Sequence, residues 1–321
     1  MRTWDGLPIA DEEPHGASVA VRRIRGETPE FLVLHRNVNG PDYEGDWAWT
    51  SPAGARQPGE PVYRAVLREL TEETGITAAD VWAVDLSGRW AVFAADVADD
   101  AVVDLIDPEH DRYEWLEAPA ARARILPSYV AETQVDRVVA IPRVSLGFRP
   151  MSRADLPDVV RWTTAPHVAR WWDQESTDLG AAERHYGPAI DGSNPTRMWV
   201  LEVNGRSVGF VQDYLIGDHP ECALLTARPD AVGFDYAIGD PAWIARGVGT
   251  RMLWTFLRDV VRPHYPHAKQ FFASPDHRNA ASLRVLDKLG FARGTWFDEP
   301  QRNGRVDTLV GCCLDVPRVF G

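Results

Sequence analysis

Hydrophobic and polar residues alternate along short segments of the first half of the chain, with the two-residue period of β-strands. The clearest segments are residues 17–24, ASVAVRRI, and 30–36, EFLVLHR, which the turn residues RGETP separate. Residues 81–97, VWAVDLSGRWAVFAADV, predict a hairpin that turns near Ser87-Gly88. Residues 45–52, GDWAWTSP, predict a further short strand that ends at its proline.

The hydrophobic period becomes helical between these strand segments. Val62–Thr74 predicts a helix, because Pro61 suits the start of a helix and Gly75 suits its end. Residues 118–126 and 130–140 predict two more helices, which close the first folded unit.

A second series of elements begins after residues 141–150, IPRVSLGFRP, which we interpret as the junction. We therefore expect two domains, residues 1–143 and 144–321, each of ordinary size. Strands are predicted at residues 145–151, 198–203, 207–216, 231–238 and 268–274. Helices are predicted at residues 153–163, from the turn ARGVGT to about residue 261, and within residues 279–291. This order predicts a mixed α/β (α+β) fold.

Composition excludes several classes of protein. The chain has 321 residues, 45% of them hydrophobic, and a net charge of −13. Residues 1–145 hold 26 acidic and 14 basic residues, which argues against a nucleic-acid surface and suits a site that collects divalent cations. The sequence has neither a membrane-length apolar run nor a signal-like start, so we expect a cytoplasmic protein without a membrane partner. Its cysteines, Cys222, Cys312 and Cys313, lack zinc-site spacing, and we interpret them as small hydrophobic residues, the last two in a final strand.

Three glutamates lie on nearly one face of the predicted helix Val62–Thr74. Glu69 and Glu72 are three residues apart, and Glu69 and Glu73 are four apart, so their charges repel one another and destabilise the helix. A hard cation with oxygen ligands, such as Mg²⁺, would relieve this repulsion. The alternative for the glutamates taken alone is a solvated acidic surface.

The residues around the glutamates favour the metal site. The segment fits the spacing G-x5-E-x7-R-E-U-x-E-E-x-G-U at Gly54, Glu60, Arg68, Glu69, Leu70, Glu72, Glu73, Gly75 and Ile76. This pattern resembles the Nudix box of hydrolases that act on nucleoside diphosphates linked to other groups. Over residues 14–140 the resemblance implies an α/β/α sandwich, with Mg²⁺ or Mn²⁺ held by Glu69, Glu72 and Glu73, and with Glu72 and Glu73 as catalytic carboxylates. It also implies an ion pair between Arg68 and Glu60 that fixes the loop against the helix. The segment EHDRYEWLEAPAA resembles one in nucleoside and dihydroneopterin triphosphate pyrophosphohydrolases, which implies that Glu109 also reaches the metal site.

The second half carries a glycine-containing turn between a predicted strand and a predicted helix. Its residues ARGVGT let backbone N–H groups approach an anion such as a pyrophosphate, although such a turn can also be only a turn. Together with NAASLRVLDKLGF, the turn resembles the Gcn5-related N-acetyltransferases (GNAT), which implies a mixed-sheet domain that uses acetyl-CoA. The implied cofactor-binding residues are Ala245, Arg246, Gly247, Val248, Gly249, Thr250 and Asn279.

Three further segments, HVARWWDQES, VGFVQDY and FDYAIG, are similar to the aminoglycoside 6'-N-acetyltransferases. The similarity implies that Asp235 binds and deprotonates the acceptor amine, and that Trp172, Gln212, Asp213 and Tyr214 line the acceptor pocket. A structural carboxylate is the alternative for Asp235, and core packing or a lid is the alternative for Trp172. Leu286 stands where this family has the tyrosine that reprotonates the thiolate, and Ile244 stands where it has Gln or Arg.

The sequence therefore predicts a bifunctional enzyme with small-molecule substrates. One domain would hydrolyse a nucleotide pyrophosphate bond, and the other would acetylate an amine, with an aminoglycoside as the expected acceptor. The alternatives are another acceptor amine, such as a metabolite or a siderophore precursor, or a domain that only binds or scaffolds. The sequence leaves a homodimer open.

Overall fold

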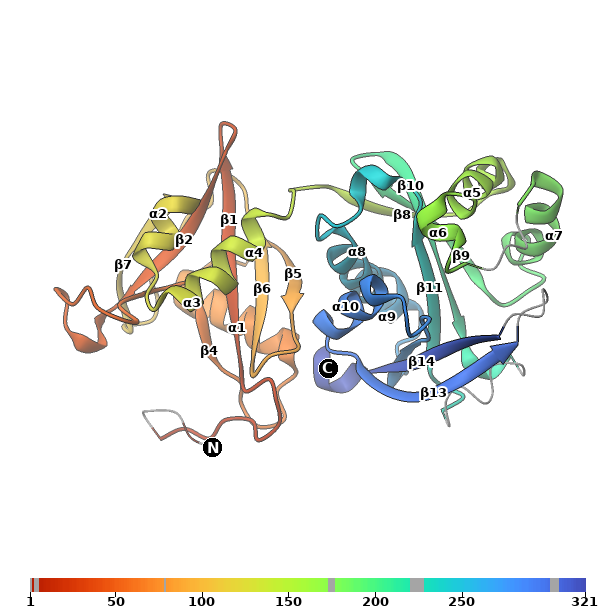
Figure 1. The fold of residues 1–321 in the computed structure, drawn as a ribbon. Helices are drawn as coiled ribbons and strands as arrows, with labels where there is room; N and C mark the ends of the chain where they lie inside the picture. The colour runs from red at the N-terminus through yellow and green to blue at the C-terminus, as the bar shows by residue number, and fades with distance from the viewer. Residues whose placement is uncertain (1, 3–5, 78, 173–176, 220–227, 301–305) are drawn as a thin grey trace. The chain divides into compact units, whose positions relative to one another are not determined.

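A computed structural model describes residues 2, 6–77, 79–172, 177–219, 228–300 and 306–321. The chain forms two compact units (Figure 1). The first comprises the chain up to Arg143 with Lys288–Gly290 and Pro317–Gly321, and the second comprises Val144–Asp287 and Phe291–Val316. Both are built on a mixed sheet with helices beside it, as the sequence predicts.

The sheet of the first unit has the order β3-β2-β1-β6-β5, with β4 paired to β1 and β7 paired to β2. β1 runs parallel to β6 and antiparallel to β2 and β4. The strands are β1 (Gly16–Arg25), β2 (Thr28–Arg36), β3 (Trp49–Thr50), β4 (Ala53–Ala55), β5 (Asp80–Asp85), β6 (Trp90–Asp96) and β7 (His110–Glu117). Only two residues of the predicted strand 45–52 are extended and paired, in β3.

The central strand β1 is buried on both faces from Gly16 to Arg22, because helices cover both sides of the sheet. This layering confirms the predicted α/β/α arrangement. The helices are α1 (Val62–Thr74), α2 (Ala118–Arg124), α3 (Ser128–Ala131) and α4 (Arg137–Val139), and the π-helical turn η2 (Glu132–Asp136) joins the last two. The bounds of α1 are those that the sequence predicts, and Gly75 ends the helix in the left-handed conformation at φ 69°.

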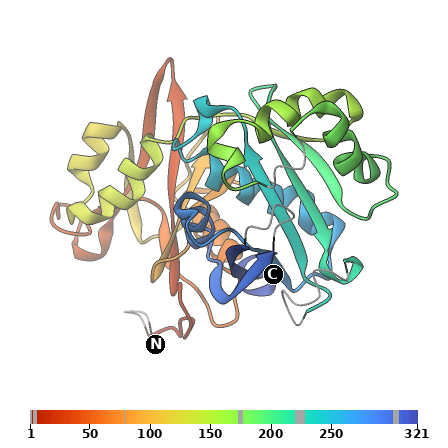
Figure 2. The ribbon, with the colours of Figure 1, turned by 45° about the vertical axis from the view of Figure 1, so that its right-hand side comes forward.

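The sheet of the second unit has the order β13-β14-β12-β11-β10-β9-β8 (Figures 1 and 2). Its strands are β8 (Leu146–Pro150), β9 (Arg197–Val203), β10 (Arg206–Leu215), β11 (Val232–Ile238), β12 (Gln270–Ala273), β13 (Ala292–Pro300) and β14 (Val306–Asp315). β11 and β12 are parallel, and the other pairs are antiparallel. The predicted hairpin turn joins β9 to β10, where Asn204 and Gly205 both have positive φ.

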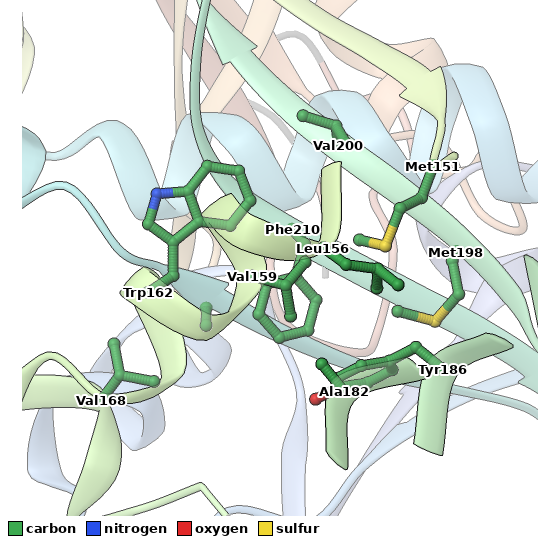
Figure 3. Close-up of a cluster of buried hydrophobic side chains, with 11 residues drawn as sticks. Met151, Leu156, Val159, Trp162, Val168, Ala182, Tyr186, Met198, Val200 and Phe210 are labelled. Atoms are coloured by element: carbon green, nitrogen blue, oxygen red, sulfur yellow. The ribbon is translucent and has the colours of Figure 1, made fainter. Parts of the chain in front are cut away.

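Helices cover both faces of this sheet. On one face, α5 (Leu156–Thr163) and α7 (Leu179–Ile190) enclose a core around Trp162, Tyr186 and Phe210 (Figure 3). On the other face, Phe256 of α8 (Val248–Phe256) packs against Phe148 and Trp199. The remaining helices are α6 (Pro166–Ala169), α9 (Arg262–His264), α10 (Ala280–Lys288) and α11 (Val316–Val319), and the π-helical turn η8 (Leu257–Val261) extends α8.

Helix α7 has no counterpart among the predicted elements. Gly180, Gly187 and Pro188 lie within it, and these residue types disfavour a helix interior. The predicted final strand is β14, in which Cys312 is buried and Cys313 is half-buried, whereas Cys222 lies outside the described residues. None of the helices in the described part of the chain combines the length and the hydrophobicity that a bilayer crossing demands.

Candidate active sites

The three box glutamates of α1 differ in exposure. Val62, Ala65, Val66 and Leu70 anchor the helix in the core of the first unit. Glu69 and Glu73 are buried, at 7% and 4% exposure, whereas the side chain of Glu72 is 51% exposed. The burial of two carboxylates argues against a solvated acidic surface.

One guanidinium holds two of these glutamates. Arg68 Nη1 donates to Glu69 Oε1 at 2.7 Å and to Glu72 Oε2 at 3.0 Å. Its Nε and Nη2 donate to both oxygens of Glu60 at 2.8 and 3.0 Å. Nη2 also donates to the carbonyl of Ala55 at 3.0 Å, which ties β4 to the helix. Arg68 therefore neutralises the carboxylates and fixes the preceding loop.

The backbone of β4 approaches the carboxylates closely. A Cβ atom at Gly54 would lie 2.1 Å from the carboxyl carbon of Glu69, so any side chain at this position would displace that carboxylate. The neighbouring N–H of Ala53 donates to Glu73 Oε2 at 3.1 Å. Gly54 is thus required at this position for space rather than for a positive φ.

The electrostatics of the site disfavour its negative charges. Burial raises the pKa of Glu69 to about 7, against the opposing effect of Arg68. Burial, followed by repulsion from Glu69, raises the pKa of Glu73 well above its usual range. Glu109 contributes to the same repulsion, and it pairs with Arg36. The structure thus brings the box carboxylates and Glu109 into one electrostatic environment.

The predicted metal ligands are not arranged as a ready coordination shell. In the described parts of the chain, no three His, Cys, Asp or Glu side chains converge closely enough to hold a metal ion. The physical reason is that Arg68 draws Glu69 and Glu72 toward itself. The donors nevertheless fit Mg²⁺ or Mn²⁺, because all are carboxylate oxygens, the side chain of Glu72 is half-exposed, and a cation would relieve the buried charge.

In the second unit, strand β11 separates from β12 after its first two residues. β11 pairs with β10 from Val232 to Ile238, but its pairing with β12 covers only Val232 and Gly233. Within the described residues, the edge of residues 234–238 that faces β12 therefore carries no strand ladder. An extended ligand could pair with the backbone there.

The predicted pyrophosphate loop lies at the start of α8. Ala245 and Gly247 have positive φ, at 58° and 76°, and α8 begins directly afterwards. A Cβ atom at Gly249 would lie 3.5 Å from Val285 of α10 and 3.8 Å from Ile238 of β11. The start of α8, with its N–H groups, therefore lies between α10 and the free part of β11.

The other predicted cofactor residue, Asn279, caps α10. Its Oδ1 accepts from the N–H of Ser282 at 3.2 Å, and its own N–H donates to the carbonyl of Asp276. Asp276 in turn pairs with Arg278 at 2.6 Å. The structure thus gives the side-chain oxygen of Asn279 a structural partner, at the N-terminal end of α10.

Four of the predicted acceptor and catalytic residues lie on one face of the sheet. Gln212 Nε2 donates to Asp235 Oδ2 at 2.9 Å, and Tyr214 also hydrogen-bonds to Asp235. Trp172 packs edge-on against Phe210 of the same face, with the ring centroids 4.8 Å apart. Asp235 is partly exposed, yet burial raises its pKa, against the opposing hydrogen bonds from Gln212 and Tyr214. A raised pKa suits a group that accepts a proton.

The fifth residue, Asp213, lies on the opposite face. Its neighbours in β10 are Gln212 and Tyr214, and successive residues of a strand point to opposite sides. Asp213 has no exposed surface, and it accepts from Arg197 at 2.6 Å and from Trp199 Nε1 at 2.8 Å. This geometry does not fit the acceptor-binding prediction for Asp213, and we assign the residue a structural ion pair instead.

The sequence reasoning did not identify a hydroxyl pair beside these residues. Tyr236, next to Asp235 but on the other face of β11, has its hydroxyl 2.8 Å from Ser282 Oγ of α10. Leu286 lies one turn further along α10 and is fully buried. The sequence did contain one indication of this pair, because Tyr236 directly follows Asp235, the predicted catalytic aspartate.

Comparisons with known proteins find a known family in each half of the chain. The NUDIX domain family matches residues 14–133, and the acetyltransferase (GNAT) domain family matches residues 152–299. The asymmetrical bis(5'-nucleosyl)-tetraphosphatase of Mus musculus is 30% identical over 108 residues, which span 30% of this chain and 69% of that protein.

Two proteins match the second half. Lysine N-acyltransferase MbtK of Mycobacterium tuberculosis is 24% identical over 161 residues, 49% of this chain and 75% of that protein. The crystal structure of aminoglycoside acetyltransferase AAC(6')-Ib with coenzyme A is 19% identical, with a TM-score of 0.46, and covers 53% of this chain and 95% of that one. The chain therefore belongs to the Nudix family through residues 14–133 and carries an acetyltransferase domain of the GNAT family in residues 152–299.

Proposed function

We propose that the chain is a bifunctional enzyme whose two domains, residues 1–143 and 144–321, each catalyse one reaction. The first domain hydrolyses a pyrophosphate bond of a nucleoside diphosphate derivative. The second acetylates a primary amine of a small molecule. The buried carboxylates Glu69 and Glu73, whose pKa values are raised, carry the first assignment. The partly exposed Asp235 beside the free edge of β11 carries the second.

In the first domain, Glu69, Glu72, Glu73 and Glu109 would hold a divalent cation. When bound, such a cation neutralises a diphosphate and acidifies a water molecule. The chain's own contribution is preorganisation: Arg68 holds Glu69 through Nη1, and the N–H of Ala53 holds Glu73. Glu72, the most exposed box glutamate, is the group best able to change its position when a ligand binds.

The name of the mouse relative suggests a substrate in which a phosphate chain joins two nucleosides. The test is release of nucleotide from diadenosine tetraphosphate and from a nucleoside triphosphate, with and without Mg²⁺. Glu72→Gln should abolish the Mg²⁺-dependent reaction, whereas the exposed Glu132→Gln should not. Equal hydrolysis by both variants would exclude the box as the catalytic site.

In the second domain, Asp235 would receive the acceptor amine. Acetyl-CoA supplies the acyl group in the activated form of a thioester. An alkyl amine is mostly protonated near neutral pH, and it must lose a proton before it can attack. Asp235 is placed to bind the ammonium group and to accept its proton, and Gln212 and Tyr214 hold the carboxylate in position.

Two acceptor classes remain as proposals. The segments that resemble aminoglycoside 6'-N-acetyltransferases predict an aminoglycoside. The second candidate is a single side-chain amine, which the match to lysine N-acyltransferase MbtK favours. The structure also favours a less highly charged acceptor, because Asp213 points away from Gln212 and is already paired with Arg197.

The deciding experiment is an acceptor screen with acetyl-CoA that includes kanamycin and L-lysine. Asp235→Asn should abolish transfer while coenzyme A binding persists, and Asp230→Asn, at an exposed position outside the site, should behave as wild type. Coenzyme A binding without transfer to any amine would show that the second domain only binds.

A further inference from the structure

Acetyl transfer leaves a charge that Asp235 cannot stabilise. When the amine attacks, a C–N bond forms and the C–S bond breaks, with its electron pair left on sulfur. Asp235 has already taken one proton from the ammonium group, and the second proton that the nitrogen loses after attack goes to water, so the sulfur departs as a thiolate. A hydrogen-bond donor placed at the sulfur lowers the free energy of this step. This inference rests on the acetyl transfer proposed above.

The free edge of β11 is the place where such a donor has to act. Asp235 and Tyr236 are consecutive, so their side chains leave this strand on opposite faces. Beyond Gly233 the described residues show no pairing with β12 along this edge. A ligand at the open edge would therefore have Asp235 on one side and Tyr236 on the other.

The hydroxyl of Tyr236 lies on the side where the coenzyme is expected. It is 2.8 Å from Ser282 Oγ, and Ser282 follows the cap Asn279 by three residues. Ile238, two residues after Tyr236 on the same face, and Val285, three residues after Ser282, both lie near Gly249 at the start of α8. Tyr236 and Ser282 are both partly exposed residues.

Helix α10 itself offers no donor one turn further on. Leu286 follows Ser282 by four residues, on the same face, and its side chain is apolar and fully buried. Tyr236 instead brings a phenol to this helix face from the neighbouring strand. We propose that Tyr236, positioned by Ser282, donates a hydrogen bond to the departing sulfur and stabilises the thiolate.

The acidity of the phenol decides between donating a hydrogen bond and transferring the proton. Burial raises the pKa of Tyr236 to about 12. A thiol has a pKa of about 8.5, so the phenol keeps its proton and water protonates the thiolate. The other titratable group near the phenol is Cys312 of β14, whose pKa burial raises to about 11. Tyr236 therefore remains a donor throughout the neutral range.

The test measures the thiol pKa of coenzyme A bound to the enzyme, from the ultraviolet absorption of the thiolate as a function of pH. The titration of enzyme without ligand is subtracted, which removes the signals of the protein's own cysteines. Tyr236→Phe should raise the pKa of the bound thiol by about one to two units, because a hydrogen bond to a charged group is lost. The same loss should lower kcat about tenfold to hundredfold.

Ser282→Ala is the second variant, and it should give a smaller shift in the same direction. The exposed Tyr129→Phe, in the first unit, is the matched control. An unchanged thiol pKa in Tyr236→Phe would overturn the inference, even if coenzyme A bound more weakly. Failure of the wild type to bind coenzyme A would instead overturn the proposed acetyl transfer, and this inference with it.

Discussion

Replacement of Glu69 by glutamine should stabilise the first domain at pH 8 in the absence of divalent cations. The pKa of Glu69 is raised from 4.5 to about 7, so the folded state holds this proton to higher pH than the unfolded chain does. Stability is therefore lost as the pH rises from 4.5 to about 7. The difference of about 2.5 units between the two pKa values of Glu69 corresponds to about 3 kcal/mol of unfolding free energy lost at pH 8. An uncharged glutamine at this position would restore that free energy.

The assay is amide hydrogen exchange of peptides from Val62–Thr74 as a function of urea, at pH 4 and pH 8, with chelator present. The gain from Glu69→Gln should be about 3 kcal/mol at pH 8 and close to zero at pH 4, where both states are protonated. Glu72→Gln is the control, because its half-exposed pair with Arg68 should change stability by less than about 0.5 kcal/mol.

In saturating Mg²⁺, the wild type should become more stable than Glu69→Gln. A cation at one thousand times its Kd stabilises the wild type by about 4.1 kcal/mol, which exceeds the advantage of about 3 kcal/mol of Glu69→Gln in chelator, and Glu69→Gln should lose most of this gain. The reasoning is refuted if Glu69→Gln destabilises the domain at pH 8 in chelator. It is also refuted if the effect is the same at both pH values, since that would mean that the carboxylate is not strained by burial.

Three further predictions test individual contacts. Gly54→Ala should leave the fold intact but weaken Mg²⁺ binding and hydrolysis about tenfold, because its Cβ would displace the buried carboxylate of Glu69; titration calorimetry with Mg²⁺ and steady-state assays measure this. The pH–rate profile of wild-type acetyl transfer should have an acid limb above the usual aspartate range, because the pKa of Asp235 is raised, and Asp235→Asn should abolish transfer at every pH. Asp213→Asn should leave the KM for the acceptor unchanged, because Asp213 faces away from Gln212 and Tyr214; steady-state kinetics with the acceptor measures this.

The sequence predicted the helix that carries the three glutamates well, because helix geometry converts spacing directly into position. Val62–Thr74 forms as expected, so Glu69, Glu72 and Glu73 could be placed relative to one another from their numbers alone. The ion pair of Arg68 with Glu60, which the resemblance implies, is present in the structure. The bonds of Arg68 to Glu72 and to the carbonyl of Ala55 were not predicted, since the latter depends on where β4 returns in space.

The acceptor site shows what resemblance alone overlooks. Gln212, Asp213 and Tyr214 match one motif together, but the period of a strand requires the middle residue to face away from the other two. Strand alternation was readable from the sequence and would have excluded Asp213. The Tyr236–Ser282 contact was not readable, because it joins a strand and a helix 46 residues apart.

The hydrogen-bond and ion-pair partners of a buried carboxylate help to show whether its role is structural or functional. Asp213 is fully buried, yet Arg197 and Trp199 satisfy it within the protein, so its burial needs no ligand. Glu73 receives one backbone N–H and faces the repulsion of Glu69 and Glu109, so its ionised form is poorly compensated. A fold that retains this strain beside a glycine with no room for a side chain is best explained by a cation that relieves it.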